Sequence, residues 1–97
     1  MRKNNTANEI IRDVTKIENG IIYRYILTAE KSKSVASYQL PLYSIEVIMT
    51  KDGRVTKNSV NNVFADVGKA LSFFEHISRN LATPIDLPYA LEDKISL

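Results

Sequence analysis

The sequence of 97 residues contains no cysteine. Disulfide bonds and thiolate metal sites are therefore excluded, and the chain suits a reducing compartment. No apolar run approaches the roughly 18 to 20 residues that a membrane helix needs, and the basic N-terminus is not followed by the apolar segment of a signal peptide. These absences predict a cytoplasmic protein that binds no membrane and holds its core together by packing alone.

Residues that carry chemistry are also scarce. His76 is the only histidine, and the three glycines are isolated, so there is no glycine-rich loop to hold phosphate. The neighbouring acids Glu92 and Asp93 would point about 100° apart on a helix and do not converge. We therefore expect a protein that is not an enzyme and that uses no metal or cofactor.

The net charge of +2 is too small to indicate nucleic-acid binding by itself. Its distribution is uneven: residues 1–33 carry seven bases and four acids, whereas residues 65–97 carry three bases and five acids. The chain is thus mildly basic at its start and mildly acidic at its end. This polarity is typical of ordinary solvated faces, and it leaves open a surface that recognises a charged partner.

The length predicts a single domain over residues 1–97, with residues 1–8 flexible. Within it, Asn19-Gly20 can supply the two positive-φ residues of a type I′ turn between strands near 10–18 and 21–30. A two-residue loop pairs Glu18 with Ile21, Lys16 with Tyr23, Val14 with Tyr25 and Arg12 with Leu27. The same register places Tyr23, Tyr25 and Leu27 on one face and Ile11, Ile17, Ile22 and Ile26 on the other.

Residues 8–17 also fit a short amphipathic helix, because Ile10, Ile11, Val14 and Ile17 recur at helical spacing. We favour the strand, since the Asn-Gly turn needs a partner strand before it. The helix remains the alternative at this point.

A second hairpin is predicted around Asp52-Gly53. Its register pairs Lys51 with Arg54, Met49 with Thr56, Val47 with Asn58 and Ile45 with Val60. Ile45, Val47, Met49 and Val60 then share the core face, while Glu46, Lys57 and Ser59 point away.

From Asp66 onward the apolar period changes from two to three and four. The pattern predicts a helix of about 14 residues, with Asp66 as its N-cap. The apolar stripe consists of Val67, Ala70, Leu71, Phe74, Ile77, Ser78 and Leu81. Leu71 and Phe74 are the expected centre of the core.

The last segment, "NLATPIDLPYALEDKI", shows an N-cap pattern at Thr83, Pro84 and Asp86. Pro88 would remove a donor that a helix starting there needs. We therefore expect a turn over residues 83–87 and a helix that begins near Pro88, anchored by Tyr89, Leu91 and Ile95. Together these elements predict an α+β domain: a four-stranded, mainly antiparallel sheet from two β-hairpins, one long helix packed across it, and a short C-terminal helix.

The order of "NGIIYRYIL", "YSIEV", "DVGKALSFFEHISRN" and "ATPIDLPYALEDKI" resembles a family of small uncharacterised proteins from clostridia and related Gram-positive bacteria. The similarity runs from about Gly20 to Ile95, with "TPIDL" and "LED" as its most distinctive parts. The chain departs from that pattern at Pro88, where a polar residue is expected. Because the family is a domain of unknown function, the resemblance implies a fold and lends no site residue.

The candidate partner-binding residues are aromatic and basic: Arg12, Lys16, Tyr23, Arg24, Tyr25, Tyr38 and Tyr43. Aromatic rings stack on bases and nearby cations meet phosphates, which would suit nucleic acid. The same tyrosines also suit a half-buried sheet, where the ring packs and the hydroxyl stays wet. The sequence leaves both interpretations open.

We expect a small non-enzymatic binding protein that modulates or inhibits a larger bacterial protein or protein–RNA machine. A specific version is an inhibitor carried on a mobile element, such as an anti-CRISPR protein. A duplex-DNA mimic should be strongly acidic, which this chain is not. The alternative is direct nucleic-acid binding by the basic first hairpin. A homodimer through the second apolar face of that hairpin is compatible with either function.

Overall fold

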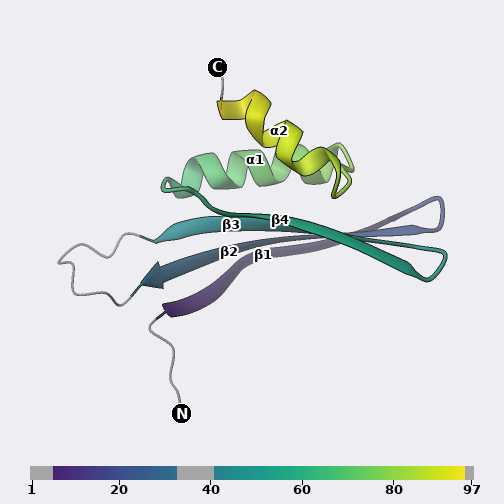
Figure 1. The fold of residues 1–97 in the computed structure, drawn as a ribbon, viewed down its shortest axis with the longest axis horizontal. Coiled ribbons are helices and arrows are strands. Elements are labelled where there is room, and N and C mark those ends of the chain that lie inside the picture. The colour runs from purple at the N-terminus through teal and green to yellow at the C-terminus, as the bar shows by residue number, and fades with distance from the viewer. Residues whose placement is uncertain (1–5, 33–40, 96–97) are drawn as a thin grey trace, which may run out of the picture.

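The computed structural model describes residues 6–32 and 41–95 of the chain. They form one four-stranded antiparallel sheet in the order β1-β2-β3-β4 and two helices. The elements are β1 (Thr6–Glu18), β2 (Ile21–Ser32), β3 (Leu42–Lys51), β4 (Arg54–Phe64), α1 (Val67–Arg79) and α2 (Asp86–Ile95). Both helices lie on the same side of the sheet (Figure 1). The predicted α+β fold is therefore confirmed.

The two tight turns fix the register of both hairpins. Asn19 and Gly20 have φ of 55° and 80°, and Asp52 and Gly53 have φ of 53° and 78°. These positive values fit the type I′ turns that the two dipeptides favour. Every strand pair predicted for the first hairpin from Arg12 onward, and for the second hairpin, is present. Residues 8–17 belong to a strand, so the alternative helix is wrong.

One prediction about the first hairpin is wrong. The register of β1 against β2 shifts between Ile10, which pairs with Thr28, and Arg12, which pairs with Leu27. Ile11 is the extra residue of this β-bulge, and it packs against the core instead of sharing the far face with Ile17. The inserted residue breaks the alternation that the prediction extended beyond Arg12.

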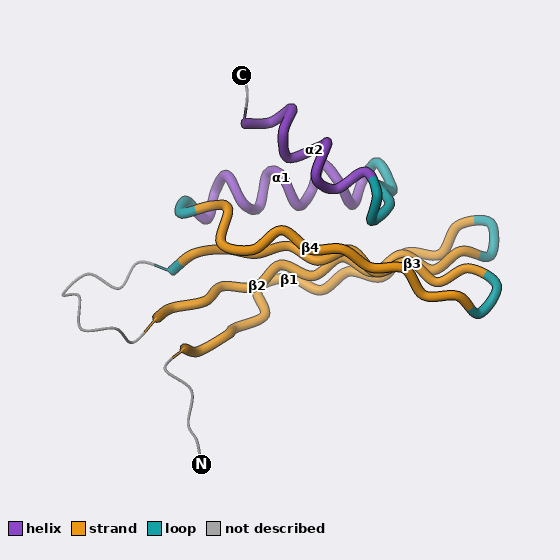
Figure 2. Tube along the Cα trace, viewed as in Figure 1, coloured by secondary structure: helices purple, strands orange, loops and turns teal. Residues whose placement is uncertain are grey.

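The core lies between the sheet and the helices. Its sheet side consists of the buried residues Tyr23, Tyr25, Leu27, Ala29, Tyr43, Ile45, Val47 and Phe64. Met49 and Val60 are partly buried against it, on the core face where the second hairpin places them. The opposite face of the sheet, which carries Glu46, Lys57 and Ser59, has no helix over it in the described residues (Figure 2).

Helix α1 starts and ends as its caps dictate, but its buried stripe is rotated from the predicted one. The Asp66 side chain accepts hydrogen bonds from the backbone N–H groups of Gly68 and Lys69, and Asn80 is the C-cap. The buried residues are Ala70, Phe73, Phe74, Ile77 and Ser78. Phe73 takes the place predicted for Leu71 at the centre of the core. Its ring packs against that of Phe64, with the two ring centroids 5.5 Å apart. Val67 is exposed.

Helix α2 begins at Asp86, two residues before the position predicted for it. Thr83 and Asp86 form the expected reciprocal cap, in which each side chain accepts from the other residue's backbone N–H. The fully buried anchor is Leu87, whereas Tyr89 is 66% exposed, so the prediction of Tyr89 as an anchor is wrong. Leu91 is partly buried against the core, as expected, and the side chain of Ile95 lies outside the described part.

The two hairpin turns project from the same end of the sheet, past the helices (Figure 1). Across the described residues, neither helix has the length and apolar character needed to cross a membrane.

Candidate functional site

The structure separates the sequence-predicted site residues into three groups. Arg12 and Lys16 lie on the helix side of β1, because they pair with the buried Leu27 and Tyr23 of β2. Arg24 lies on the opposite face of the sheet. The tyrosines are in the core, apart from Tyr38, which lies outside the described residues.

The tyrosine rings pack under the helices and are not exposed to a ligand. Tyr23, Tyr25 and Tyr43 are all buried, and the rings of Tyr23 and Tyr25 are parallel with centroids 6.5 Å apart. The Tyr25 hydroxyl donates a hydrogen bond to the backbone carbonyl of Ala82, 2.9 Å away. Tyr25 therefore helps to position the segment that follows α1, and the faces of the three buried rings are not available to stack on bases in this structure.

Arg24 is held by Asp13 on the far face of the sheet. Its Nε and Nη2 atoms donate to the two carboxylate oxygens at 3.0 and 2.7 Å. These hydrogen bonds and the charge of the guanidinium hold the pKa of the Asp13 carboxyl below its ordinary value. Arg24 is thus an ion-paired residue that does not join Arg12 and Lys16.

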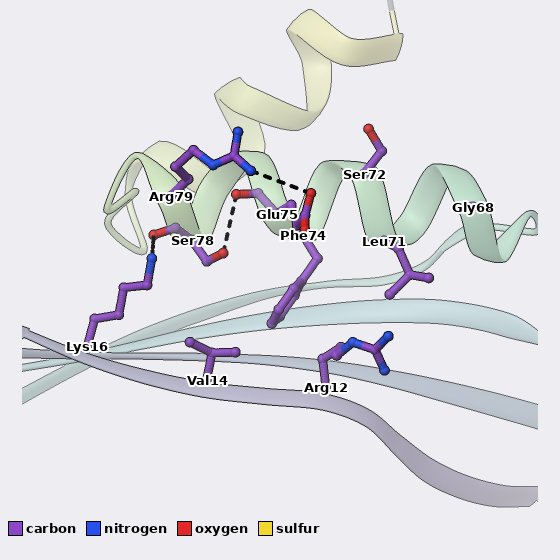
Figure 3. Close-up of a pocket in the computed structure, with 10 residues that line it drawn as sticks. All are labelled: Arg12, Val14, Lys16, Gly68, Leu71, Ser72, Phe74, Glu75, Ser78 and Arg79. Atoms are coloured by element: carbon purple, nitrogen blue, oxygen red, sulfur yellow. Dashed lines mark hydrogen bonds and ion pairs between the residues drawn. The ribbon is translucent and has the colours of Figure 1, made fainter.

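Arg12 and Lys16 instead line a groove between β1 and α1 (Figure 3). We call it the β1–α1 groove; its volume is about 590 Å³. It is bordered by Arg12, Val14 and Lys16 from β1 and by Gly68, Leu71, Ser72, Phe74, Glu75, Ser78 and Arg79 from α1. Helix α1 packs mainly over β2, β3 and β4, and the groove lies on its side toward β1.

The groove has an apolar floor and a basic rim. Leu71 and Val14 are half-buried and Phe74 is buried, whereas the charged residues around them are mostly exposed. Its lining includes three cations and one carboxylate. That carboxylate, on Glu75, already has a partner in Arg79 at 3.7 Å. The groove therefore has a positive excess charge.

Two backbone carbonyls hold the cations of β1 in place. Lys16 Nζ donates to the carbonyl of Ser78 in the last turn of α1 at 3.0 Å. The C-terminal carbonyls of a helix have no intrahelical donor and carry partial negative charge, so a lysine there is favourable. Arg12 donates to the carbonyl of the bulge residue Ile11 at 2.8 Å. In the described part of the chain, neither cation forms an ion pair with a carboxylate.

Sequence reasoning singled out Arg12 and Lys16 but missed the helical half of the groove. The sequence predicts Leu71 at the centre of the core, and it does not indicate Glu75 or Arg79 as partner-binding residues. The spacing of Arg79 after Glu75 was visible as an i,i+4 ion pair, but nothing in the sequence places that pair beside β1.

The described residues contain no group of three His, Asp or Glu side chains that could hold a metal ion. His76 is exposed on α1, where its backbone carbonyl accepts from Asn80 Nδ2 at 2.7 Å. The arrangement on β1 and α1 can bind an anionic or mixed apolar and anionic group by contact.

Comparison with curated proteins finds no match, and comparison with solved structures finds none. A comparison with family models matches residues 4–97 to a family of unknown function, DUF6514. Since this match spans nearly the whole chain, the protein belongs to the DUF6514 family.

Proposed function

We propose that this protein is a non-enzymatic binding protein that holds a partner protein in the β1–α1 groove. The observation that carries the proposal is the pairing of an apolar floor with two cations, Arg12 and Lys16, whose only partners among the described residues are backbone carbonyls. Groups of this kind bind a partner by burying apolar area and by adding charge-assisted hydrogen bonds.

The partner that we propose is a larger bacterial protein or protein–RNA complex, which this chain modulates or inhibits by occupying a surface. The sequence resemblance to proteins of clostridia and other Gram-positive bacteria makes a lysate of such a bacterium the first source of partners. An inhibitor from a mobile element, such as an anti-CRISPR protein, is one specific form of this function. The small net charge of +2 argues against inhibition by mimicry of duplex DNA.

An affinity pulldown from that lysate tests the proposal, with half of the sample treated with nuclease. The test variant is R12Q/K16Q, which removes both groove cations but keeps polar side chains of similar length. The matched control is R54Q/K57Q, which removes two cations from β4 at the opposite edge of the sheet. We expect one protein to survive nuclease treatment with the wild type and the control, and to be lost with R12Q/K16Q. Equal capture by all three proteins would reject the groove as the site.

Direct nucleic-acid binding is the second candidate, because phosphate is also a ligand for Arg12 and Lys16. Burial removes the rings of Tyr23 and Tyr25 from base stacking, and Arg24 is already paired with Asp13, so Arg12 and Lys16 are the cations of this hairpin that phosphate would contact. This function predicts that affinity for a single-stranded oligonucleotide falls steeply with salt and that R12Q/K16Q weakens it more than R24Q does. Binding that is unaltered in R12Q/K16Q would exclude it.

A further inference from the structure

The strand β1 lies at one end of the sheet and has no partner on its outer side in the described residues. Glu18 and Ile21 close a two-residue turn, so this pair exchanges backbone hydrogen bonds. Counting back from Glu18, the backbone groups of every second residue, which are Lys16, Val14 and Arg12, therefore also bond to β2. The backbone N–H and C=O groups of Asp13, Thr15 and Ile17 are directed outward, where an added strand would bond to them.

The side chains that flank this edge alternate in the same way. Arg12, Val14 and Lys16 face the side of the sheet on which α1 lies, and they line the β1–α1 groove. An added strand would lie about 4.8 Å from β1, with every second side chain on that same side. The groove is therefore placed to receive alternate side chains of an extended chain.

We infer that an extended acidic segment of a partner protein adds to the edge of β1 as a fifth strand, with alternate side chains in the β1–α1 groove. This inference rests on the proposed function and specifies its binding mode. Arg12 and Lys16 are four residues apart, about 13 Å along a strand, with Val14 midway between them. The matching segment is acid–x–apolar–x–acid, a pattern that fits in either strand direction.

Features of β1 favour such a partner over a second copy of this chain. The bulge at Ile11 interrupts the edge and limits regular addition to residues 12–18. Pairing two copies about Val14 would place Arg12 of one opposite Lys16 of the other, and like charges directly opposite destabilise a strand pair. An acidic segment instead supplies carboxylates to both cations.

The probe is the peptide acetyl-TETVTET-amide, titrated into isotope-labelled full-length protein and followed by NMR. We expect chemical-shift changes at residues 12–18 and along the groove side of α1, and slowed amide exchange at Asp13, Thr15 and Ile17. The charge-reversed peptide TKTVTKT should not bind. The variant R12Q/K16Q should weaken binding about tenfold, and affinity should fall with salt.

Proline variants separate strand addition from simple charge attraction. Thr15→Pro removes a backbone N–H that points outward from β1, and edge strands tolerate proline at such positions. Lys57→Pro removes an outward N–H from the β4 edge and is the matched control. Thr15→Pro should abolish peptide binding and Lys57→Pro should leave it unchanged, with both folds checked by their NMR spectra. If Thr15→Pro fails to fold, R12E/K16E tests the groove. This variant should bind TKTVTKT in preference to the acidic peptide.

Three other outcomes are possible, and each would contradict a different part of the inference. If R12Q/K16Q loses the peptide but Thr15→Pro keeps it, the groove binds acidic chains without strand addition, and only this inference fails. If no peptide binds at about 1 mM, strand addition by an acidic segment is overturned, while the pulldown still tests the proposed function. If light scattering shows a dimer that Thr15→Pro dissociates, the occupant of the edge is a second copy and the inference is wrong.

Discussion

The hydroxyl of Tyr25 connects the centre of the sheet to the segment between the helices. It donates to the carbonyl of Ala82 at 2.9 Å, and its ring is fully buried. Burial, and then the nearby Tyr23 and Asp86, raise the pKa of Tyr25 to about 12. Because the unfolded side chain loses its proton near pH 10, the folded protein binds more protons than the unfolded chain between these two values.

Stability should therefore be fully present below about pH 10 and should fall by up to about 1.4 kcal/mol per pH unit as pH rises toward about 12. Urea unfolding of the wild type and of Tyr25→Phe across this range measures the effect. The variant should be less stable at neutral pH by about 1 kcal/mol, since it lacks the bond to Ala82. The stability of the variant should also fall less than that of the wild type as pH rises from about 10 to about 12. An equal fall in both proteins would contradict the role of the hydroxyl.

Pro88 leaves the carbonyl of Pro84 without a donor inside α2, because a helix bonds each carbonyl to the N–H four residues later. Asn58 on β4 supplies that donor through its Nδ2 atom at 3.2 Å. The side chain thus lets α2 keep a proline in its first turn and connects the helix to the sheet.

Asn58→Ala should destabilise the wild type by about 1 kcal/mol, because a partly buried carbonyl loses its partner. In the background of Pro88→Ala, which restores an N–H to the helix, the same change should cost less. A double-mutant cycle by urea unfolding measures the difference. The bond from the Ser59 N–H to Asn58 Oδ1 is lost in both backgrounds and cancels. If Asn58→Ala lowers the free energy of unfolding equally in both backgrounds, Asn58 does not compensate for the N–H that Pro88 lacks.

Among the elements, the hairpins were predictable and the helices were predictable only in part. Asn19-Gly20 and Asp52-Gly53 each specify a two-residue turn, and the turn fixes every later pair until the register shifts. The bulge at Ile11 has no comparable signal, because both Ile10 and Ile11 are apolar. Sequence therefore gives Arg12 and Lys16 a common face, but it does not show which face carries the helices.

The rotation of α1 has a tertiary cause. The apolar residues of this helix fit two stripes, one centred on Leu71 and one on Phe73. Phe64 at the end of β4 packs against Phe73, and α2 packs against α1 with Leu87 buried in the shared core. These contacts come from segments distant in sequence, so they select the stripe without leaving a local pattern. The rotation also leaves Leu71 half-buried beside β1, which creates the floor of the groove.

Substitutions in the two stripes should lower the free energy of unfolding by very different amounts. Phe73→Ala removes a fully buried ring and should destabilise the protein by about 3–5 kcal/mol. Leu71→Ala should cost only about 1 kcal/mol, because the side chain is half-buried beside the groove. Urea unfolding of both variants checks the order. A larger loss for Leu71→Ala would restore the stripe predicted from the sequence.

At the scale of the whole molecule, the face of the sheet that no described helix covers determines whether two copies associate. Ile17, Ile22 and Val55 are 68%, 40% and 64% exposed there, near the hairpin ends. The sequence is compatible with a homodimer through this face. Beside these residues, however, the same face carries the ion pair between Asp13 and Arg24.

Covering this face with a second copy would also bury Glu46 and Lys57, which pair on it with Ile26 and Ile48. Desolvating such charges costs several kcal/mol unless each gains a new partner, and an isologous contact offers only the same surface again. We therefore expect a monomer of 11.0 kDa by light scattering at about 100 μM. A dimer that Ile22→Lys dissociates would show instead that the apolar residues outweigh the charges. Because Ile22 lies on the face opposite the β1–α1 groove, the same variant should leave binding of the acidic peptide unchanged.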